Sequence, residues 1–222
     1  MKIGLVYICA PIYQNNGWFS RRFAMSYAQF GPGYPHRSIV VENGLQIADN
    51  TKNTLKSSIP ECVFVRGDNV GWDIGAYRSI ASQNKKWGFD ALFCCGTSTH
   101  FKRSGWLKRM ADVWNKRGPG FYGSMGSFVI RPHIRTAGGF LISPELLVTY
   151  PHQTKSKKER YNFEHGKQNI EWWATRNGKP AMVVAWDGEY DKRRYGAIPR
   201  GHQNKDQSNC LNCDRVSDMY SR

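Results

Sequence analysis

The sequence has few acidic residues and no long apolar run. It contains 17 Asp and Glu against 32 Lys and Arg, which gives its 222 residues a formal net charge of +15. This shortage of acids favours anionic partners such as nucleic acid, phosphate-bearing lipids or glycans, and nucleotides. No apolar stretch approaches the ~20 residues that a membrane-spanning helix needs, and Pro11 interrupts the first one too early for a secretion signal. We therefore expect a cytoplasmic protein without transmembrane segments, and contact with a membrane surface stays open.

The six cysteines show no spacing typical of a disulfide framework. Cys9, Cys62, Cys94 and Cys95 lie within apolar runs, where reduced cysteine packs as a small hydrophobic residue. The other two form a single C-x-x-C at 210–213, and a zinc site would need a second pair of ligands. We predict reduced cysteines and assign no metal-ligating residues, and a divalent metal as cofactor stays open.

Apolar runs and helical patterns alternate along most of the chain. The strand-like runs are 3–9, 38–41, 62–65, 90–95, 121–130, 138–142 and 181–186. The helical patterns are 18–29, 73–84, 104–116, 144–150 and about 164–177. Nearly continuous apolar runs are typical of parallel strands that are covered on both faces. The alternation predicts an α/β/α sandwich of Rossmann type with a mostly parallel central sheet.

We expect one domain over residues 1–199, since a chain of this length usually builds a single core. The stretch 200–222 is polar and has no hydrophobic periodicity. It is predicted to be a basic C-terminal tail or a flap over the rest of the domain.

A glycine-rich stretch, GDNVGWDIGAYRSIA at 67–81, follows the third predicted strand. No G-K-[ST] follows its glycines, and their four-residue spacing does not give G-x-G-x-x-G, so neither a P-loop nor a dinucleotide site is supported. Ligands in open α/β sheets nevertheless bind beyond the carboxyl ends of the strands. Polar segments follow four predicted strands: PIY at 11–13, ENG at 42–44, GDNVGWD at 67–73 and GTSTH at 96–100.

In their order these segments resemble GT-A-type nucleotide-sugar glycosyltransferases, in particular the family-two enzymes and their rhamnan-synthesis-like relatives. Family-two enzymes have P-x-Y after the first strand and V-V-D-(D/N)-G-S-x-D-x-T at the second; this chain has APIY at 10–13 and IVVENGLQIADNT at 39–51. The rhamnan-synthesis-like group has N-x-G-x-D-(I/F)-G-x-(F/Y) in the third loop, here NVGWDIGAY at 69–77. The resemblance covers about residues 1–150 and implies a GT-A-like fold and a nucleotide-diphosphate sugar as donor.

One part of the family pattern is missing. GT-A enzymes usually carry D-x-D after the fourth strand, where it holds a divalent cation against the donor diphosphate, but residues 94–99 read CCGTST. Magnesium and manganese prefer hard oxygen ligands such as carboxylates. The resemblance therefore implies either transfer without a D-x-D metal, with basic side chains neutralising the leaving diphosphate, or a fold that has lost activity. Rhamnan-synthesis-like relatives also have hydroxyl residues at this place.

The resemblance implies donor-binding residues at the strand ends and in the C-terminal segment. They are Pro11, Tyr13, Glu42, Asn69, Gly71, Asp73, Thr97, Ser98, Arg200, His202 and Lys205. The first two would shape the nucleobase pocket, and the last three would fold over the diphosphate. Asp73 is equally well placed to cap the following helix, and Glu42 equally well to lie at the surface at a strand end.

For transfer to a hydroxyl with inversion, a base must take the proton. Family-two enzymes place an acidic residue at the start of a late helix, and NFEHGKQNIEWW at 162–173 offers Glu164 there, with His165 beside it. We predict these two as catalytic residues; the structural alternative for Glu164 is a first-turn position favoured by the helix dipole. His133 and Arg135 are predicted to line the acceptor cleft.

The sequence therefore predicts an inverting glycosyltransferase. The acceptor would be a hydroxyl of a surface polysaccharide, of a lipid-linked glycan or of modified DNA. Two alternatives stay open: a non-enzymatic nucleic-acid-binding protein, in which tryptophans stack on bases beside basic residues, and a degenerate transferase fold that binds sugar.

Overall fold

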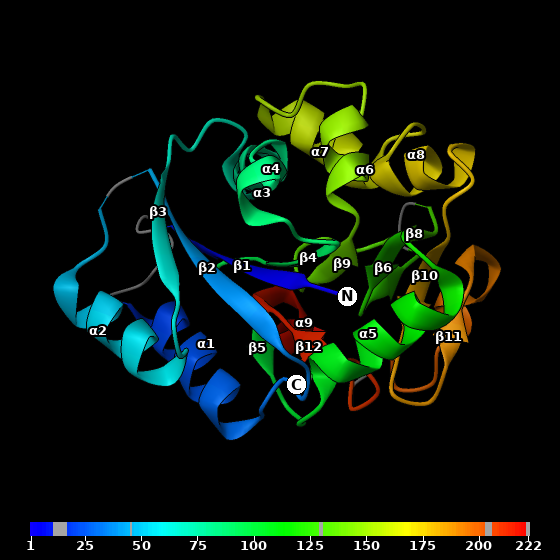
Figure 1. Cartoon of the computed structure of the whole chain (residues 1–222). Coiled ribbons are helices and arrows are strands. Elements are labelled where there is room, and N and C mark those ends of the chain that lie inside the picture. The colour runs from blue at the N-terminus through cyan, green and yellow to red at the C-terminus, as the bar shows by residue number, and fades with distance from the viewer. Residues whose placement is uncertain (11–16, 45, 129–130, 203–205, 221–222) are drawn as a thin grey trace.

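A mixed β-sheet lies at the centre of the protein. The structure is a computed structural model and describes residues 1–10, 17–44, 46–128, 131–202 and 206–220. Within these residues, eight strands form one sheet in the order β11-β10-β6-β9-β4-β1-β2-β3 (Figure 1). Its strands are β1 (Ile3–Cys9), β2 (His36–Asn43), β3 (Val63–Gly67), β4 (Ala91–Cys95), β6 (Phe121–Gly123), β9 (Phe140–Ile142), β10 (Ala181–Val184) and β11 (Glu189–Tyr190).

Most strands of this sheet run in one direction. β1 pairs in parallel with β2 and β4, β2 with β3, and β6 with β10. Only two of the described strands are reversed: β9 is antiparallel to β4 and β6, and β11 is antiparallel to β10. The prediction of a mostly parallel sheet is confirmed, with the reversed strands in the second half of the chain.

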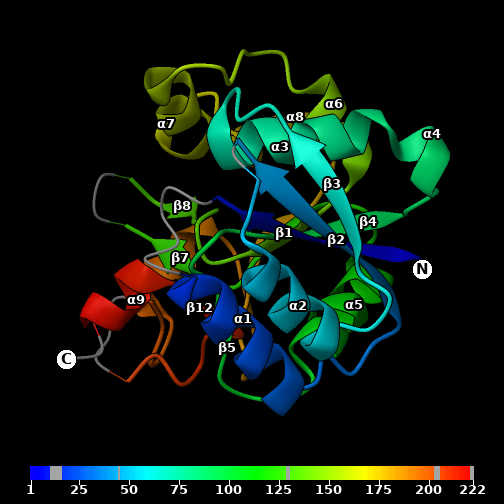
Figure 2. The same cartoon turned by 90° about the vertical axis from the view of Figure 1, so that its left-hand side faces the viewer.

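Helices cover both faces of the sheet (Figures 1 and 2). One face carries α1 (Trp18–Gln29), α2 (Asp49–Ser58) and α5 (Trp106–Arg117). The other carries α3 (Trp72–Ser82), α4 (Asn84–Trp87), α6 (Pro144–Thr149), α7 (Lys157–His165) and α8 (Ile170–Arg176). The α/β/α sandwich predicted from the sequence is therefore confirmed. No described helix combines the length and the apolar composition that crossing a membrane requires.

The sheet separates two apolar cores, and β1 contributes to both. Leu5 and Tyr7 pack on the side of α1 and α5, whereas Val6 and Ile8 pack on the side of α3 and α6. Since successive side chains of a strand point to opposite faces, a strand covered on both faces must be apolar throughout. This explains the unbroken apolar run at 3–9, all of which is buried.

Some predicted elements are wrong in extent. The single helix expected at 164–177 is two helices: Ser156 begins α7 with a capping box to Glu159, and α7 ends before Gly166. Asn169 then begins α8, its side chain accepting a hydrogen bond from the Trp172 amide. The apolar run 121–130 is not one strand, since β6 ends at Gly123 and the short β7 (Gly126–Ser127) follows.

Parts of the C-terminal segment pack against the domain. β12 (Asn212–Cys213) pairs with β5 (His100–Phe101), and β7 pairs with β8 (His133–Ile134). A 3-10 helix (Lys192–Ala197) precedes this segment, and α9 (Arg215–Tyr220) is its last described element. Arg22 of α1 forms an ion pair with Asp218 and a 2.8 Å hydrogen bond with His100 Nε2, so α9 is tied to α1. The predicted domain boundary between 199 and 200 stays a prediction.

Candidate functional site

A cavity of about 840 Å³ lies at the carboxyl ends of β1 to β4. Its walls come from the residues that follow these strands, from α7 and from the start of α9. Four of the predicted donor-binding residues line it: Asn69, Asp73, Thr97 and Ser98. A cavity of this size and place, at the carboxyl edge of a largely parallel sheet, is typical of a binding site for a small molecule.

The loop after β3 is fixed by Asn43, the last residue of β2. The Asn43 amide donates hydrogen bonds of 3.0 Å to Asn69 Oδ1 and to the Trp72 carbonyl, and its Oδ1 accepts one of 3.0 Å from the Asn69 amide. Asn43 is 3% exposed, so its hydrogen-bonding atoms need these partners. It also lines the cavity, and the sequence analysis named its neighbour Glu42 instead.

Gly71 lets this loop approach the segment before α7. Its φ of +77° is left-handed, and a Cβ there would lie 2.2 Å from the Thr154 carbonyl oxygen. At Gly75 a Cβ would lie 1.8 Å from the Val70 carbonyl oxygen. Both glycines of the N-x-G-x-D-I-G pattern are therefore required by close backbone packing, which brings the loop against α7.

Asp73 lies in the first turn of α3 and faces the cavity. Its Oδ1 accepts hydrogen bonds of 3.1 Å from the Ile74 amide and from the Arg160 guanidinium. Burial raises the pKa of Asp73, and the charge and hydrogen bond of Arg160 offset this only in part. Arg160 also lies over the ring of Trp72, 5.6 Å from its centroid. The arrangement provides a carboxylate, a cation and an aromatic face on one wall.

Among the described residues, three cations line the cavity: Lys157 and Arg160 of α7 and Arg215 of α9 (Arg215–Tyr220). The two on α7 are one turn apart, so they share one face of the helix. All three side chains are exposed on the cavity side, where they can meet a ligand. Cations grouped beyond strand ends suit an anionic ligand such as a diphosphate. Lys157 lies in the basic stretch 155–158 of the sequence, and Arg160 follows it by two residues.

The end of β4 contributes Thr97 and Ser98. The Thr97 carbonyl accepts a 3.0 Å hydrogen bond from the Tyr7 hydroxyl, and Ser98 Oγ accepts one of 3.3 Å from the Arg215 amide. Ser98 therefore holds the start of α9 at the cavity. No carboxylate follows β4 among the residues that the structure describes there, so this strand end does not fit a magnesium or manganese ion.

The predicted catalytic and acceptor residues meet beside the cavity, at the far end of α7. Glu164 Oε1 lies 3.6 Å from His133 Nε2 and 3.6 Å from His165 Nε2, and Glu164 Oε2 accepts a hydrogen bond from the Thr136 hydroxyl. Burial by itself raises the pKa of Glu164. His133, Thr136 and the charges of His165 and Arg135 outweigh it and lower the pKa to about 2. Glu164 is thus a fixed anion.

The position of Glu164 in its helix differs from the expectation. It lies in the last turn of α7, not at the start of a helix, because the capping box of Ser156 begins the helix at Lys157. The favourable helix-dipole explanation for this residue is therefore wrong. The Thr136 hydroxyl, which donates a hydrogen bond to Glu164 Oε2, stabilises the carboxylate instead.

Arg135 joins this group to the C-terminal segment. It donates hydrogen bonds of 2.7 Å to His202 Nε2 and 3.0 Å to Asp214 Oδ2, and Asp214 is 1% exposed. Burial and the charge of Arg135 lower the pKa of His202 to about 4. His202, predicted to bind the donor, is therefore neutral at pH 7 and buried beside Arg135.

The structure does not bring every predicted residue to the cavity. Glu42 is 8% exposed and forms an ion pair with Lys52 at 2.8 Å. The alternative prediction, that Glu42 lies at the surface at a strand end, is therefore wrong. Arg200 lines a different cavity, with Lys102, Arg103 and Asp187. Pro11, Tyr13 and Lys205 lie outside the described residues.

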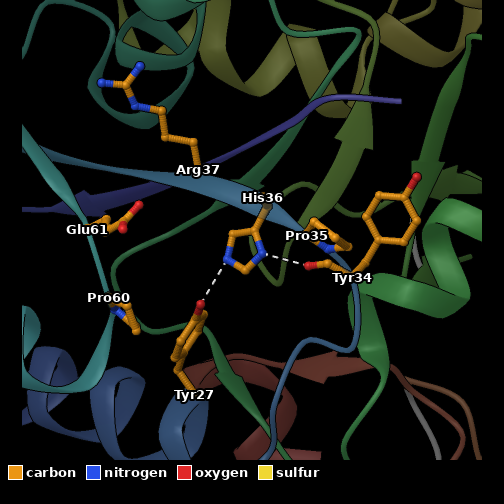
Figure 3. A pocket seen from close by; sticks show the side chains of 7 residues that line it. All are labelled: Tyr27, Tyr34, Pro35, His36, Arg37, Pro60 and Glu61. Carbon is orange, nitrogen blue, oxygen red and sulfur yellow. Dashed lines mark hydrogen bonds between the residues drawn. The ribbon is translucent and has the colours of Figure 1, made fainter.

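A further cavity, of about 520 Å³, lies near the start of β2 (Figure 3). His36 at its centre is already satisfied, since Nε2 meets the Tyr27 hydroxyl at 2.8 Å and Nδ1 meets the Tyr34 carbonyl at 2.9 Å. Arg37 points away from the histidine, and Glu61 lies apart from it at the edge of the cavity. This cavity lies at the amino end of β2, whereas ligands in open α/β sheets bind beyond the carboxyl ends of the strands. It is therefore the weaker candidate for a functional site.

The comparisons with known proteins found distant structural similarities. No protein-family model and no curated protein matches the chain. Among solved structures, the chain is similar to TarS of S. aureus, with 11% identity and a TM-score of 0.48 over 72% of this chain and 32% of TarS. The chain thus spans about a third of the length of TarS.

Two further solved structures align over more of their own length. The galactosyltransferase LgtC, solved in complex with donor and acceptor sugar analogues, is 14% identical, with a TM-score of 0.44 over 75% of this chain and 68% of LgtC. Mouse xyloside xylosyltransferase 1 is 9% identical, with a TM-score of 0.49 over 80% of this chain and 82% of that protein. Similarities this distant assign no activity to the chain.

Proposed function

We propose that the protein transfers a sugar from a nucleotide-diphosphate sugar to an acceptor hydroxyl. The observation that carries this proposal is the cavity at the ends of β1 to β4, which combines three cations with Asn43, Asn69 and Asp73. The cations suit a diphosphate, and the amides and the carboxylate suit hydroxyl groups of ribose or sugar. The motif NVGWDIGAY, which resembles that of rhamnan-synthesis-like transferases, forms the wall between them.

The leaving diphosphate needs positive charge that is in place before the bond breaks. Lys157, Arg160 and Arg215 supply it without the carboxylates of a D-x-D motif. Arg160 is held toward the cavity by its contacts with Asp73 and Trp72. We therefore propose that these side chains take the part that a metal ion has in D-x-D enzymes.

Inversion at the anomeric carbon requires a base that takes the acceptor proton. Glu164, with His165, is the pair predicted from the sequence, and Asp73 is a second candidate on the cavity wall. The raised pKa of Asp73 makes it the stronger base of the two, whereas the pKa of about 2 makes Glu164 the weaker. Activity of Asp73→Asn and Glu164→Gln over a range of pH separates the two roles.

Binding of the donor is tested by thermal shift. The protein is screened against UDP-, GDP-, dTDP- and CMP-sugars, with manganese and with EDTA. A ligand that binds the folded state alone raises its apparent stability by mass action. In EDTA we expect one donor to raise the melting temperature. In Arg160→Ala the affinity for this donor should be about tenfold weaker, because a charge-assisted contact is lost.

Arg200→Ala is the matched control, because Arg200 lines a separate cavity. It should respond to the donor as the wild type does. A loss in Arg200→Ala but not in Arg160→Ala would move the donor site to the C-terminal segment. Absence of any donor response, together with tight and salt-sensitive DNA binding, would favour the nucleic-acid alternative. Trp106 and Trp114 are in the core, which removes two of the aromatic side chains on which that alternative rested.

A further inference from the structure

His133, Glu164 and His165 form a cluster of metal-ligand type beside the cavity. One ligand atom from each residue lies within 4.8 Å of the others. Each imidazole brings Nε2 to 3.6 Å from the same oxygen, Glu164 Oε1. Ligand atoms held about 2.1 Å from a tetrahedral zinc ion are about 3.4 Å apart, so the two nitrogen–oxygen distances already match such a site.

The tautomer of His133 directs a lone pair into this cluster. Its Nδ1 lies 2.8 Å from the Arg131 carbonyl, which can only accept, so Nδ1 carries the proton. A neutral His133 therefore presents an unprotonated Nε2 toward the Glu164 carboxylate. This Nε2 is buried, in a residue that is 2% exposed, and it has no hydrogen-bond partner among the residues that the structure describes. Two buried acceptors facing each other require something positive between them.

The surroundings orient the cluster as metal sites are oriented. A ligating histidine usually donates its other N–H to a carbonyl, and a ligating carboxylate is usually hydrogen-bonded as well. Here His133 Nδ1 donates to the Arg131 carbonyl, and the Thr136 hydroxyl donates to Glu164 Oε2. The other carboxylate oxygen, Oε1, is the one that faces the two imidazoles.

The nearby cation does not occupy this place. Arg135 is 3.0 Å from Asp214 and 2.7 Å from His202, so its charge is already paired with another carboxylate. Two imidazoles and one carboxylate favour a borderline cation such as zinc over magnesium or calcium, which prefer oxygen ligands only.

We propose that His133, Glu164 and His165 bind a zinc-class divalent cation at the end of α7. The site lies apart from the strand end where a D-x-D motif would stand, and the lone C-x-x-C at 210–213 has no part in it. Three protein ligands leave a fourth position open. Binding of the cation itself is independent of the proposed function. Its consequence for sugar transfer rests on that function: Glu164 becomes a ligand, and Asp73 takes the acceptor proton.

The test measures zinc directly, with no sugar present. The whole chain is stripped with chelator, dialysed against zinc and analysed for metal content, and Co²⁺ is then added as a spectroscopic probe. We expect one zinc per chain, a rise in the melting temperature with zinc, and the visible absorption of a tetrahedral Co²⁺ site with nitrogen and oxygen ligands. In His165→Ala, zinc retention should fall at least tenfold, since a ligand is lost.

Two control variants and a folding check show whether zinc binds at the cluster itself. His152→Ala removes an exposed histidine outside the cluster and should retain zinc as the wild type does. Cys210→Ser with Cys213→Ser should also retain it. Circular dichroism of His165→Ala in EDTA verifies that the variant is folded. Zinc retained by His165→Ala, or lost with the two cysteines, would overturn the proposal.

Absence of zinc and Co²⁺ binding in the wild type would overturn it as well. Donor binding in EDTA is measured separately, so the cation site and the donor site can fail independently.

Discussion

At the scale of single residues, backbone contacts determine the conformation of the glycine-rich loop. Asn69 has a left-handed φ of +60°, stabilised by the Asn43 side chain, and Gly71 follows with a φ of +77°. Neither position tolerates a β-branched residue. The same geometry leaves Asn69 and Asp73 facing the cavity, so packing and ligand binding share the motif.

Replacing Gly71 by Ala should destabilise the protein and weaken donor binding. The new Cβ would take a left-handed φ and meet the Thr154 carbonyl oxygen at 2.2 Å. The strain and the clash together should lower the free energy of unfolding by roughly 3 kcal/mol, measured by urea denaturation. Because the loop must move, the thermal shift with the donor should also fall.

Gly88→Ala is the control for the backbone strain alone. Gly88 also has a left-handed φ, +67°, but nothing lies within 4 Å of its Cβ position. The loss should be about 1 kcal/mol, with donor binding unchanged. Equal losses in the two variants would show that the approach to Thr154 is not what requires glycine at 71.

At the scale of elements, α7 gathers the charged residues of the site. Lys157, Arg160 and Glu164 are three and four residues apart, so one face of this helix carries the cations and then the carboxylate. The start of the helix determines where that face points. Its capping box joins the Ser156 hydroxyl to the Glu159 amide and the Glu159 carboxylate to the Ser156 amide.

Ser156→Ala should loosen this helix. It removes the hydroxyl that accepts the Glu159 amide and should lower the free energy of unfolding by about 1 kcal/mol. Donor affinity should fall severalfold, because both cations of α7 lie in its first turns. Thermal shift and urea denaturation measure the two effects. Ser57 is an exposed serine of α2 whose hydroxyl donates a hydrogen bond to the Thr54 carbonyl, and Ser57→Ala should change neither quantity. A similar loss in Ser57→Ala would show that the effect of Ser156→Ala does not come from the cap.

At the scale of the whole molecule, buried histidines set the response to pH. Burial lowers the pKa of His36, His100, His165 and His202 from the ordinary value of 6.5. The unfolded chain therefore binds more protons than the folded one below pH 6.5. Stability should fall as the pH drops from 6.5, and for His100 and His202 the fall continues to about pH 4.

His100→Gln should flatten this pH dependence. Burial, and then the charge of Arg22, lower the pKa of His100 to about 4, and the histidine is 3% exposed. Glutamine can accept the Arg22 hydrogen bond but does not titrate. The loss of stability between about pH 7 and about pH 4.5 should shrink by on the order of 2 kcal/mol.

Urea denaturation at several pH values measures this difference. His152→Gln, at an exposed histidine, is the control and should follow the wild type. An unchanged slope in His100→Gln would mean that the histidine is protonated in the folded state.

Much of the first half of the fold could be predicted from the sequence, because its signals are local. The apolar run at 3–9 and the helical pattern at 18–29 match β1 and α1 residue for residue. Unbroken apolar runs and stripes of four-residue spacing follow directly from burial on two faces or on one. The loop residues Asn69 and Asp73 were found at the cavity for the same reason, since strand ends of a parallel sheet share an edge.

The sequence alone determined the layers, the mostly parallel sheet and the importance of the loop after β3. The tertiary structure alone decided which residues meet across the chain. Asn43 meets Asn69 and Arg160 meets Asp73, across 26 and 87 residues of sequence. The cluster of His133, Glu164 and His165 brings α7 to β8. Such contacts depend on where α7 and β8 pack, and no local periodicity encodes that packing. Composition determines the net charge of this protein, and tertiary packing determines where its charged side chains lie.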